Sequence, residues 1–65
     1  MKLSDYFAFI ESEFARIAFD GVHGIPSLER EKDRVKVAVL RHFQGRINPA
    51  VLEEDIRRVY YATYG

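Results

Sequence analysis

Hydrophobic side chains recur every three or four residues in three stretches of the chain, which is the spacing of one face of a helix. These stretches cover about residues 5–20, 27–44 and 49–64. The three apolar faces hold, in turn, Tyr6, Phe7, Ile10, Phe14, Ile17 and Ala18; Leu28, Val35, Ala38, Val39, His42 and Phe43; and Leu52, Ile56, Val59, Tyr60 and Thr63. The pattern predicts three amphipathic helices.

Helix-breaking and helix-capping residues separate the three stretches. Two glycines and a proline lie within residues 20–27, which predicts a loop. Ser27 stands where it can cap the second helix. Gly45 can take the left-handed conformation that closes a helix, and Asn48 followed by Pro49 is typical of a cap with proline at the first helical position.

One segment of the second stretch carries a conflicting signal. In residues 35–39 apolar and polar side chains partly alternate, as they do in a β-strand, and several of the side chains are β-branched. No breaker separates them from the helix formers on either side, and the chain offers no obvious partner strand. We therefore expect an all-α fold, a single helical domain of residues 1–65 built as a small three-helix bundle.

The size and composition of the chain narrow the classes of function. A chain of 65 residues buries only about 60% of the surface that its unfolded state exposes, enough for one small core but not for a deep substrate cleft. There is no cysteine, which excludes thiolate zinc sites and thiol nucleophiles. A glycine-rich phosphate loop is absent as well. We therefore expect no enzyme, no catalytic residues and no small-molecule substrate.

The two histidines do not indicate a metal site. His23 lies in the first loop, and His42 lies on the apolar face of the second stretch, where we expect it at the edge of the core, bonded to a backbone carbonyl or to water. Asp20, His23 and His42 lack the three- or four-residue spacing that makes a helical metal site recognisable. The sequence predicts no metal and no cofactor.

Acidic residues interrupt the apolar residues near the N-terminus. A signal peptide needs an uninterrupted apolar run, so this pattern does not predict one. No stretch approaches the roughly 18 apolar residues of a membrane span. These patterns predict a cytoplasmic protein that does not enter a membrane.

The net charge is zero, but the charges are unevenly distributed. Residues 27–46 carry six basic side chains against three acidic ones. Arg30, Arg34, Val37 and Arg41 project together on the side of the second helix opposite its apolar face. Since arginine pairs bidentately with carboxylates, this arginine stripe (Arg30, Arg34, Val37 and Arg41) is either a solvated outer face or a docking strip for an acidic partner.

Nucleic-acid binding is the alternative hypothesis, with Arg30, Arg34, Lys36 and Arg41 as its basic residues. The short turn before the third helix suggests a helix-turn-helix, yet Glu53, Glu54 and Asp55 would place three carboxylates against phosphates. A neutral chain also lacks the excess of positive charge on which such binding depends. Nucleic acid is therefore disfavoured as a partner.

Several apolar residues fall outside the three faces. They are Phe9, Phe19, Val37, Leu40 and Val51. We expect Ala8, Ser12 and Ala15 to form a flat strip of small side chains bordered by Phe9 and Phe19, which suits close approach of another helix. Two interpretations stay open: a second copy of the chain covers this strip in a homodimer, or the fold itself packs both phenylalanines.

These observations together predict a small, non-enzymatic protein-interaction module that acts by self-association or by docking another protein. Tyr61, which lies near two arginines, adds a residue type that is enriched at protein interfaces and also on single-stranded nucleic-acid platforms. The candidate partner-binding residues are Phe9, Phe19, Arg30, Arg34, Val37, Arg41 and Tyr61.

Overall fold

Three helices make up the fold, as the sequence predicts. The computed structural model describes residues 2–20, 25–44 and 46–65, without the side chains of Phe19 and Asp20. The helices are α1 (Leu3–Asp20), α2 (Leu28–Phe43) and α3 (Pro49–Tyr64), and each contacts the other two. The expected all-α three-helix architecture is confirmed, and residues 35–39 are helical despite their β-branched side chains.

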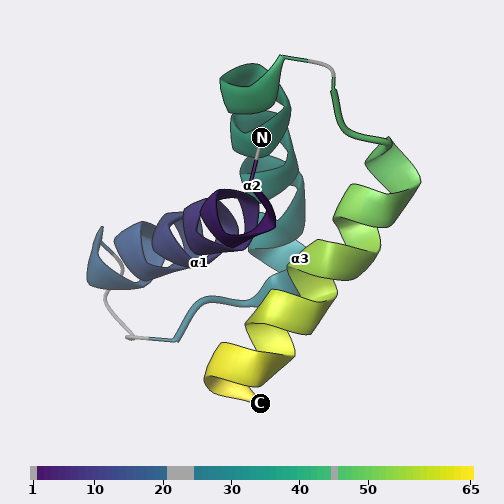
Figure 1. The fold of residues 1–65 in the computed structure, drawn as a ribbon. Helices are drawn as coiled ribbons and strands as arrows, with labels where there is room; N and C mark the ends of the chain where they lie inside the picture. The colour runs from purple at the N-terminus through teal and green to yellow at the C-terminus, as the bar shows by residue number, and fades with distance from the viewer. Residues whose placement is uncertain (1, 21–24, 45) are drawn as a thin grey trace.

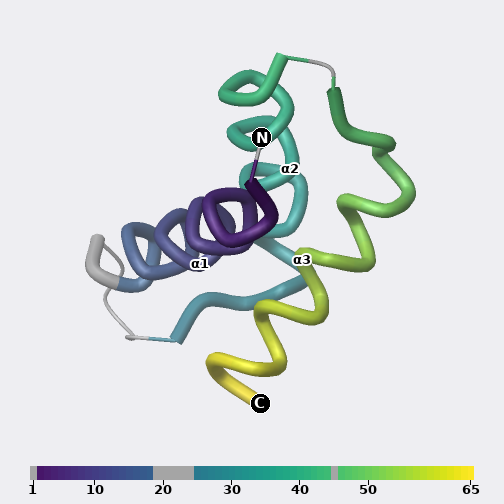
Figure 2. The backbone as a smooth tube through the Cα atoms, viewed as in Figure 1, coloured from purple at the N-terminus to yellow at the C-terminus, as the bar shows by residue number. Residues whose placement is uncertain are grey.

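The helices cross at an angle and do not lie parallel. In Figure 1, α1 is foreshortened whereas α2 and α3 are seen more nearly from the side. Figure 2 traces α2 rising through the same view and α3 descending beside it. Two neighbouring helices that diverge from a crossing leave a hollow on the surface between them, and one such hollow lies between α1 and α2.

The core lies where the three predicted apolar faces meet. Its buried hydrophobic residues are Tyr6, Ile10, Phe14, Leu28, Val35, Val39, Leu52 and Ile56. All eight belong to the predicted faces, so the periodicity identified the inward side of each helix. Burial of these side chains supplies the main free energy that opposes the loss of conformational entropy on folding.

Two tyrosines connect α1 and α3 to distant parts of the chain by hydrogen bonds. The buried Tyr6 hydroxyl donates to Asp55 Oδ2 at 2.7 Å, and the Tyr60 hydroxyl donates to the backbone oxygen of Pro26 at 2.8 Å. Burial raises the pKa of the Tyr6 phenol well above its usual value of about 10, and the hydrogen bond and negative charge of Asp55 raise it further. Tyr6 is therefore protonated at neutral pH, where its hydroxyl donates to Asp55.

The ends of α2 and α3 largely follow the capping signals. Asn48 Oδ1 accepts a hydrogen bond from the Ala50 amide at 2.9 Å, and Pro49 is the first helical residue, as predicted. Ser27 occupies the cap position of α2, but its side chain makes no capping hydrogen bond. The left-handed residue after α2 is Gln44, with φ of 50°; the prediction for Gly45 lies outside the described residues.

Removing the Asn48 side chain should lower the free energy of unfolding by about 1 kcal/mol, because the Ala50 amide loses its acceptor. Chemical denaturation of Asn48→Ala measures this loss. Ser27→Ala is the matched control, since the Ser27 hydroxyl caps nothing. Equal losses in the two variants would show that the observed cap hydrogen bond contributes no stability of its own.

Candidate functional site

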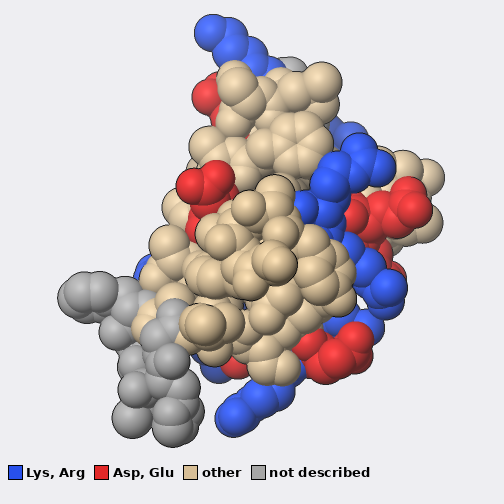
Figure 3. All heavy atoms as spheres, turned by 90° about the horizontal axis from the view of Figure 1, so that it is seen from below, with Lys and Arg blue, Asp and Glu red and all other residues tan. Residues whose placement is uncertain are grey.

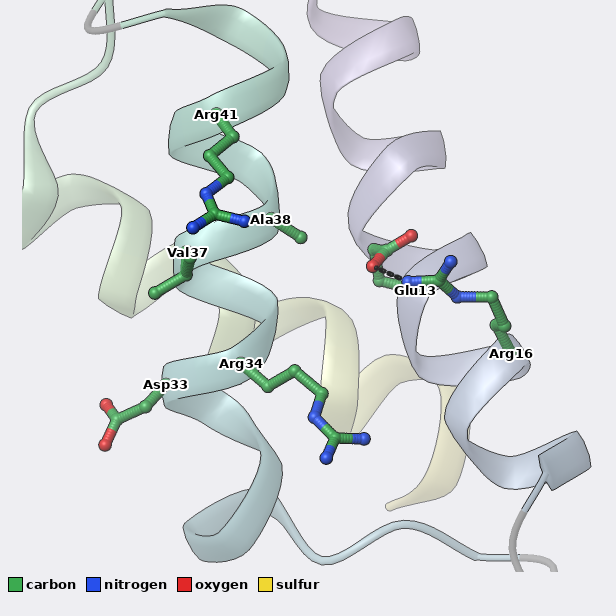
Figure 4. A pocket seen from close by; sticks show the side chains of 7 residues that line it. All are labelled: Glu13, Arg16, Asp33, Arg34, Val37, Ala38 and Arg41. Atoms are coloured by element: carbon green, nitrogen blue, oxygen red, sulfur yellow. Dashed lines mark hydrogen bonds and ion pairs between the residues drawn. The ribbon is translucent and has the colours of Figure 1, made fainter.

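An open groove of about 430 Å³ lies between α1 and α2. The two helices run in opposite directions on either side of it (Figure 4). The lining residues are Glu13 and Arg16 from α1 and Asp33, Arg34, Val37, Ala38 and Arg41 from α2. The groove therefore combines three guanidinium groups with a short apolar segment.

The α1 side of the groove is fixed by an internal ion pair. Glu13 is buried although it is charged, and its Oε1 accepts a hydrogen bond from Arg16 Nη2 at 2.7 Å. Figure 4 shows this pair facing the groove from α1. Because a buried carboxylate needs a hydrogen-bond donor, Arg16 is committed to Glu13 and is only partly available to a ligand.

The α2 side presents its cations around an exposed apolar segment. Val37 is 49% exposed, and in Figure 4 it lies with Ala38 between Arg34 and Arg41. Arg34 Nη1 is 3.7 Å from Glu31 Oε2, an ion pair without a hydrogen bond. Arg41 has no ion-pair partner among the described residues. Asp33 also lines the groove, on the same side of α2 as Val37 (Figure 4).

A stacked aromatic pair lies one helical turn beyond the groove on both helices. Phe9 precedes Glu13 by four residues and His42 follows Ala38 by four, and their ring centroids are 4.3 Å apart. Phe9 also meets Phe43 edge to face at 5.6 Å. His42 lies at the edge of the core, as expected, because it contacts Phe9 and Phe43, but it is more exposed than the sequence suggested.

The structure decides between the two interpretations of Phe9. Its ring is half-buried and packs within the chain against the core, as does Leu40, so Phe9 does not lie outside the packed surfaces. Val37 and Val51 are half-exposed, as expected for residues outside the apolar faces. The role predicted for the Phe19 side chain lies outside the described residues.

The groove brings together three of the predicted partner-binding residues, namely Arg34, Val37 and Arg41. Arg30 is exposed one turn before Arg34 and does not line the groove. Tyr61 is 60% exposed on α3, where its ring contacts Tyr60 at 5.4 Å. The arginine stripe is therefore split, and its second half forms one wall of the groove.

Two acidic residues with defined roles were missed by the sequence analysis. Glu13 lies between Ile10 and Phe14 on α1, and Asp55 lies between Leu52 and Ile56 on α3. Both acidic residues are buried and bonded to a partner side chain. Their position on an apolar face is the signal that could have identified them, because an acid there needs an internal partner.

Two of the three carboxylates at the start of α3 contact other side chains of the chain, which corrects the expectation that all three would meet phosphates. Asp55 is buried against Tyr6, and the Glu53 carboxylate lies 3.9 Å from Lys32 and 3.7 Å from Lys36. Of the three carboxylates expected to meet phosphates, Asp55 is buried, Glu53 is partly exposed and close to two lysines, and Glu54 is exposed. The same contacts place Lys36 towards α3, away from the exposed arginines of the alternative hypothesis.

Charges of both signs are mixed on the face seen in Figure 3. Its centre is uncharged, and basic and acidic side chains alternate along its margin. Such a face presents no continuous positive field for a phosphate backbone.

Two smaller hollows are mainly apolar. One, of about 280 Å³, lies between α1 and α3 and is lined by Phe7, Glu11, Arg58, Val59, Ala62 and Thr63. The other, of about 210 Å³, is lined by Leu3, Tyr6, Arg46, Ile47, Asn48, Val51 and Asp55. Asp55 in the second is already bonded to Tyr6, and neither hollow groups cations around an exposed apolar residue as the α1–α2 groove does.

Within the described ranges, no three potential metal-binding side chains converge. The side chain of Asp20 and all of His23, two of the three residues considered for such a site, lie outside those ranges. No helix in the part of the chain that the structure describes has the length and apolar character needed to cross a bilayer.

Comparison of the chain with protein-family models, with curated proteins and with solved structures finds no match.

Proposed function

We propose that this chain is a non-enzymatic protein-interaction module whose groove between α1 and α2 binds an acidic segment of another protein. The observation that carries the proposal is the position of Arg34 and Arg41 on either side of the exposed Val37. A cation on each side of an apolar surface fits a ligand that carries carboxylates around an apolar side chain.

The two arginines differ in what they offer a ligand. Arg41 has no ion-pair partner among the described residues, so a carboxylate can pair with it without displacing another. Arg34 is held only loosely by Glu31, at 3.7 Å. Charge-assisted hydrogen bonds to arginine contribute about 1.5–3 kcal/mol each, so two of them contribute about 3–6 kcal/mol and, with an apolar contact, support weak binding between about millimolar and tens of micromolar.

The lining favours docking over catalysis. It consists of guanidinium groups, carboxylates and two small apolar side chains, with no hydroxyl, thiol or imidazole among the described lining residues. The groove is also open, whereas general acid–base or nucleophilic chemistry relies on a site that excludes water. We therefore assign no catalytic role to this groove.

Another protein is a better candidate for the partner than a second copy of this chain. The homodimer hypothesis depends on free Phe9 and Phe19 side chains beside Ala8, Ser12 and Ala15, and the side chain of Phe19 lies outside the described residues. Because the Phe9 ring packs against His42 and Phe43, the exposed strip is left with small side chains at that border. Small residues alone offer little apolar area to a dimer.

Titration of isotope-labelled protein with a disordered peptide rich in glutamate and leucine tests the proposal. The amide shifts should concentrate at Arg34, Val37 and Arg41 in a nuclear magnetic resonance spectrum. Arg41→Glu should weaken binding about tenfold or more, because attraction becomes repulsion at the groove. Arg57→Glu, at an exposed arginine of α3, is the matched control and should leave affinity nearly unchanged.

Equal weakening by the two charge reversals would contradict the proposal, because the binding would then follow overall charge and not the groove. Duplex DNA and single-stranded RNA are titrated in parallel. Tighter binding of either nucleic acid, with shifts centred on Arg30, would favour the alternative hypothesis and overturn the assignment of a protein partner.

A further inference from the structure

We infer that the groove recognises one face of an amphipathic helix, with acidic side chains at positions i and i+7 and apolar side chains at i+3 or i+4. This inference rests on the proposed function and specifies its partner. It follows from the spacing of the groups that α2 presents to the groove.

The two arginines lie on the same face of α2, two helical turns apart. Arg34 and Arg41 are separated by seven residues, so their Cα atoms are about 10.5 Å apart along the helix axis. Val37 and Ala38 lie midway between them. A helix packed alongside α2 repeats the same spacing, which places i and i+7 opposite the arginines and i+3 or i+4 opposite the apolar segment.

An extended segment fits this spacing less well. Residues on the same face of a strand recur every second position, at about 6.6 Å and then about 13 Å. Neither distance matches the roughly 10.5 Å between the two arginines. A strand that placed an apolar side chain against Val37 could therefore not also align two carboxylates with Arg34 and Arg41.

The shape of the groove also suits a helix. α1 and α2 run in opposite directions on its two sides, so a further helix can rest between them as a fourth member of the bundle. Half-exposed Val37 would gain an apolar contact that the free chain does not provide. Glu13 stays neutralised by Arg16 during docking, so no carboxylate of α1 is left to repel the ligand.

A second copy of this chain does not supply the required face. Glu13 and Asp20 are the only two acidic residues in the sequence that are seven positions apart. Glu13 is buried and bonded to Arg16, so it cannot reach an arginine of another copy. The partner is therefore a different protein with an exposed acidic helix.

Two fluorescent alanine-based peptides of about 20 residues, long enough to form helix, test the inference by anisotropy titration. The in-register peptide carries glutamates at i and i+7 with leucines at i+3 and i+4. The control peptide has the same composition but carries its glutamates at i and i+5, about 140° apart on the helix. The in-register peptide should bind at least tenfold more tightly.

Single substitutions Arg34→Gln and Arg41→Gln should each remove most of that preference, whereas Arg57→Gln should retain it. Circular dichroism of each variant confirms that the exposed substitution leaves the fold intact. Equal binding of the two helical peptides, with dependence on Arg41 retained, would overturn the helical register and leave the acidic groove standing. Failure of both helical peptides and of the disordered acidic peptide would overturn the proposed function itself.

Discussion

Phe14→Ala should abolish cooperative folding. Phe14 is 1% exposed in the centre of the core, and its ring meets Tyr60 and Tyr64 edge to face at 5.5 and 6.4 Å. Truncating a buried phenylalanine costs about 3–5 kcal/mol, through lost apolar transfer and the cavity that remains. At roughly 0.05–0.15 kcal/mol per residue, the whole chain has about 3–10 kcal/mol to lose.

Thermal and urea denaturation followed by circular dichroism measure this effect. Val37→Ala is the matched control, since half of the Val37 side chain already faces solvent and its loss should change stability by less than about 1 kcal/mol. A cooperative Phe14→Ala transition near the wild-type midpoint would show that α1 does not pack against α3 as described.

Tyr6→Phe should cost about 2–3 kcal/mol, although it removes a single oxygen. The substitution leaves the buried Asp55 carboxylate without the hydroxyl that bonds it at 2.7 Å. A buried acceptor without a donor loses its hydration and gains nothing in return, and a charged one loses more than a neutral one. Urea denaturation at neutral pH measures the loss.

Replacing both partners should be milder than replacing one. Tyr6→Phe combined with Asp55→Leu removes the unpaired carboxylate, so the double variant should be more stable than Tyr6→Phe alone. Strict additivity of the two single substitutions would contradict a direct interaction between Tyr6 and Asp55.

The same pair predicts how stability depends on alkaline pH. The pKa of Tyr6 is raised in the folded chain, so above about pH 10 the unfolded chain releases a proton that the folded chain keeps. The free energy of unfolding then falls as pH rises, with a slope of up to about 1.4 kcal/mol per pH unit from this group. The advantage of wild type over Tyr6→Phe should therefore shrink between about pH 9 and pH 11. A constant difference would show that Tyr6 titrates freely.

The helices and the face that each one buries follow from the order of the amino acids alone. Both depend on local spacing: the apolar residues of α2 recur at helical intervals, and Asn48 with Pro49 starts α3 whatever lies around it. The residues that form the core could therefore be identified before their neighbours were known. The arginines of α2 were also found in this way, because residues that share one face of a helix are fixed by its period.

Which residues pack against each helix face depends on how the three helices are arranged in space. Phe9 packs against α2 because the two helices approach each other on a side that the wheel of α1 leaves open. Tyr6 and Asp55 are 49 residues apart, and Arg16 and Arg41 reach the same groove from different helices. The crossing angle of the helices determines such pairings, and it results from packing of the whole core and not from the period of any one segment.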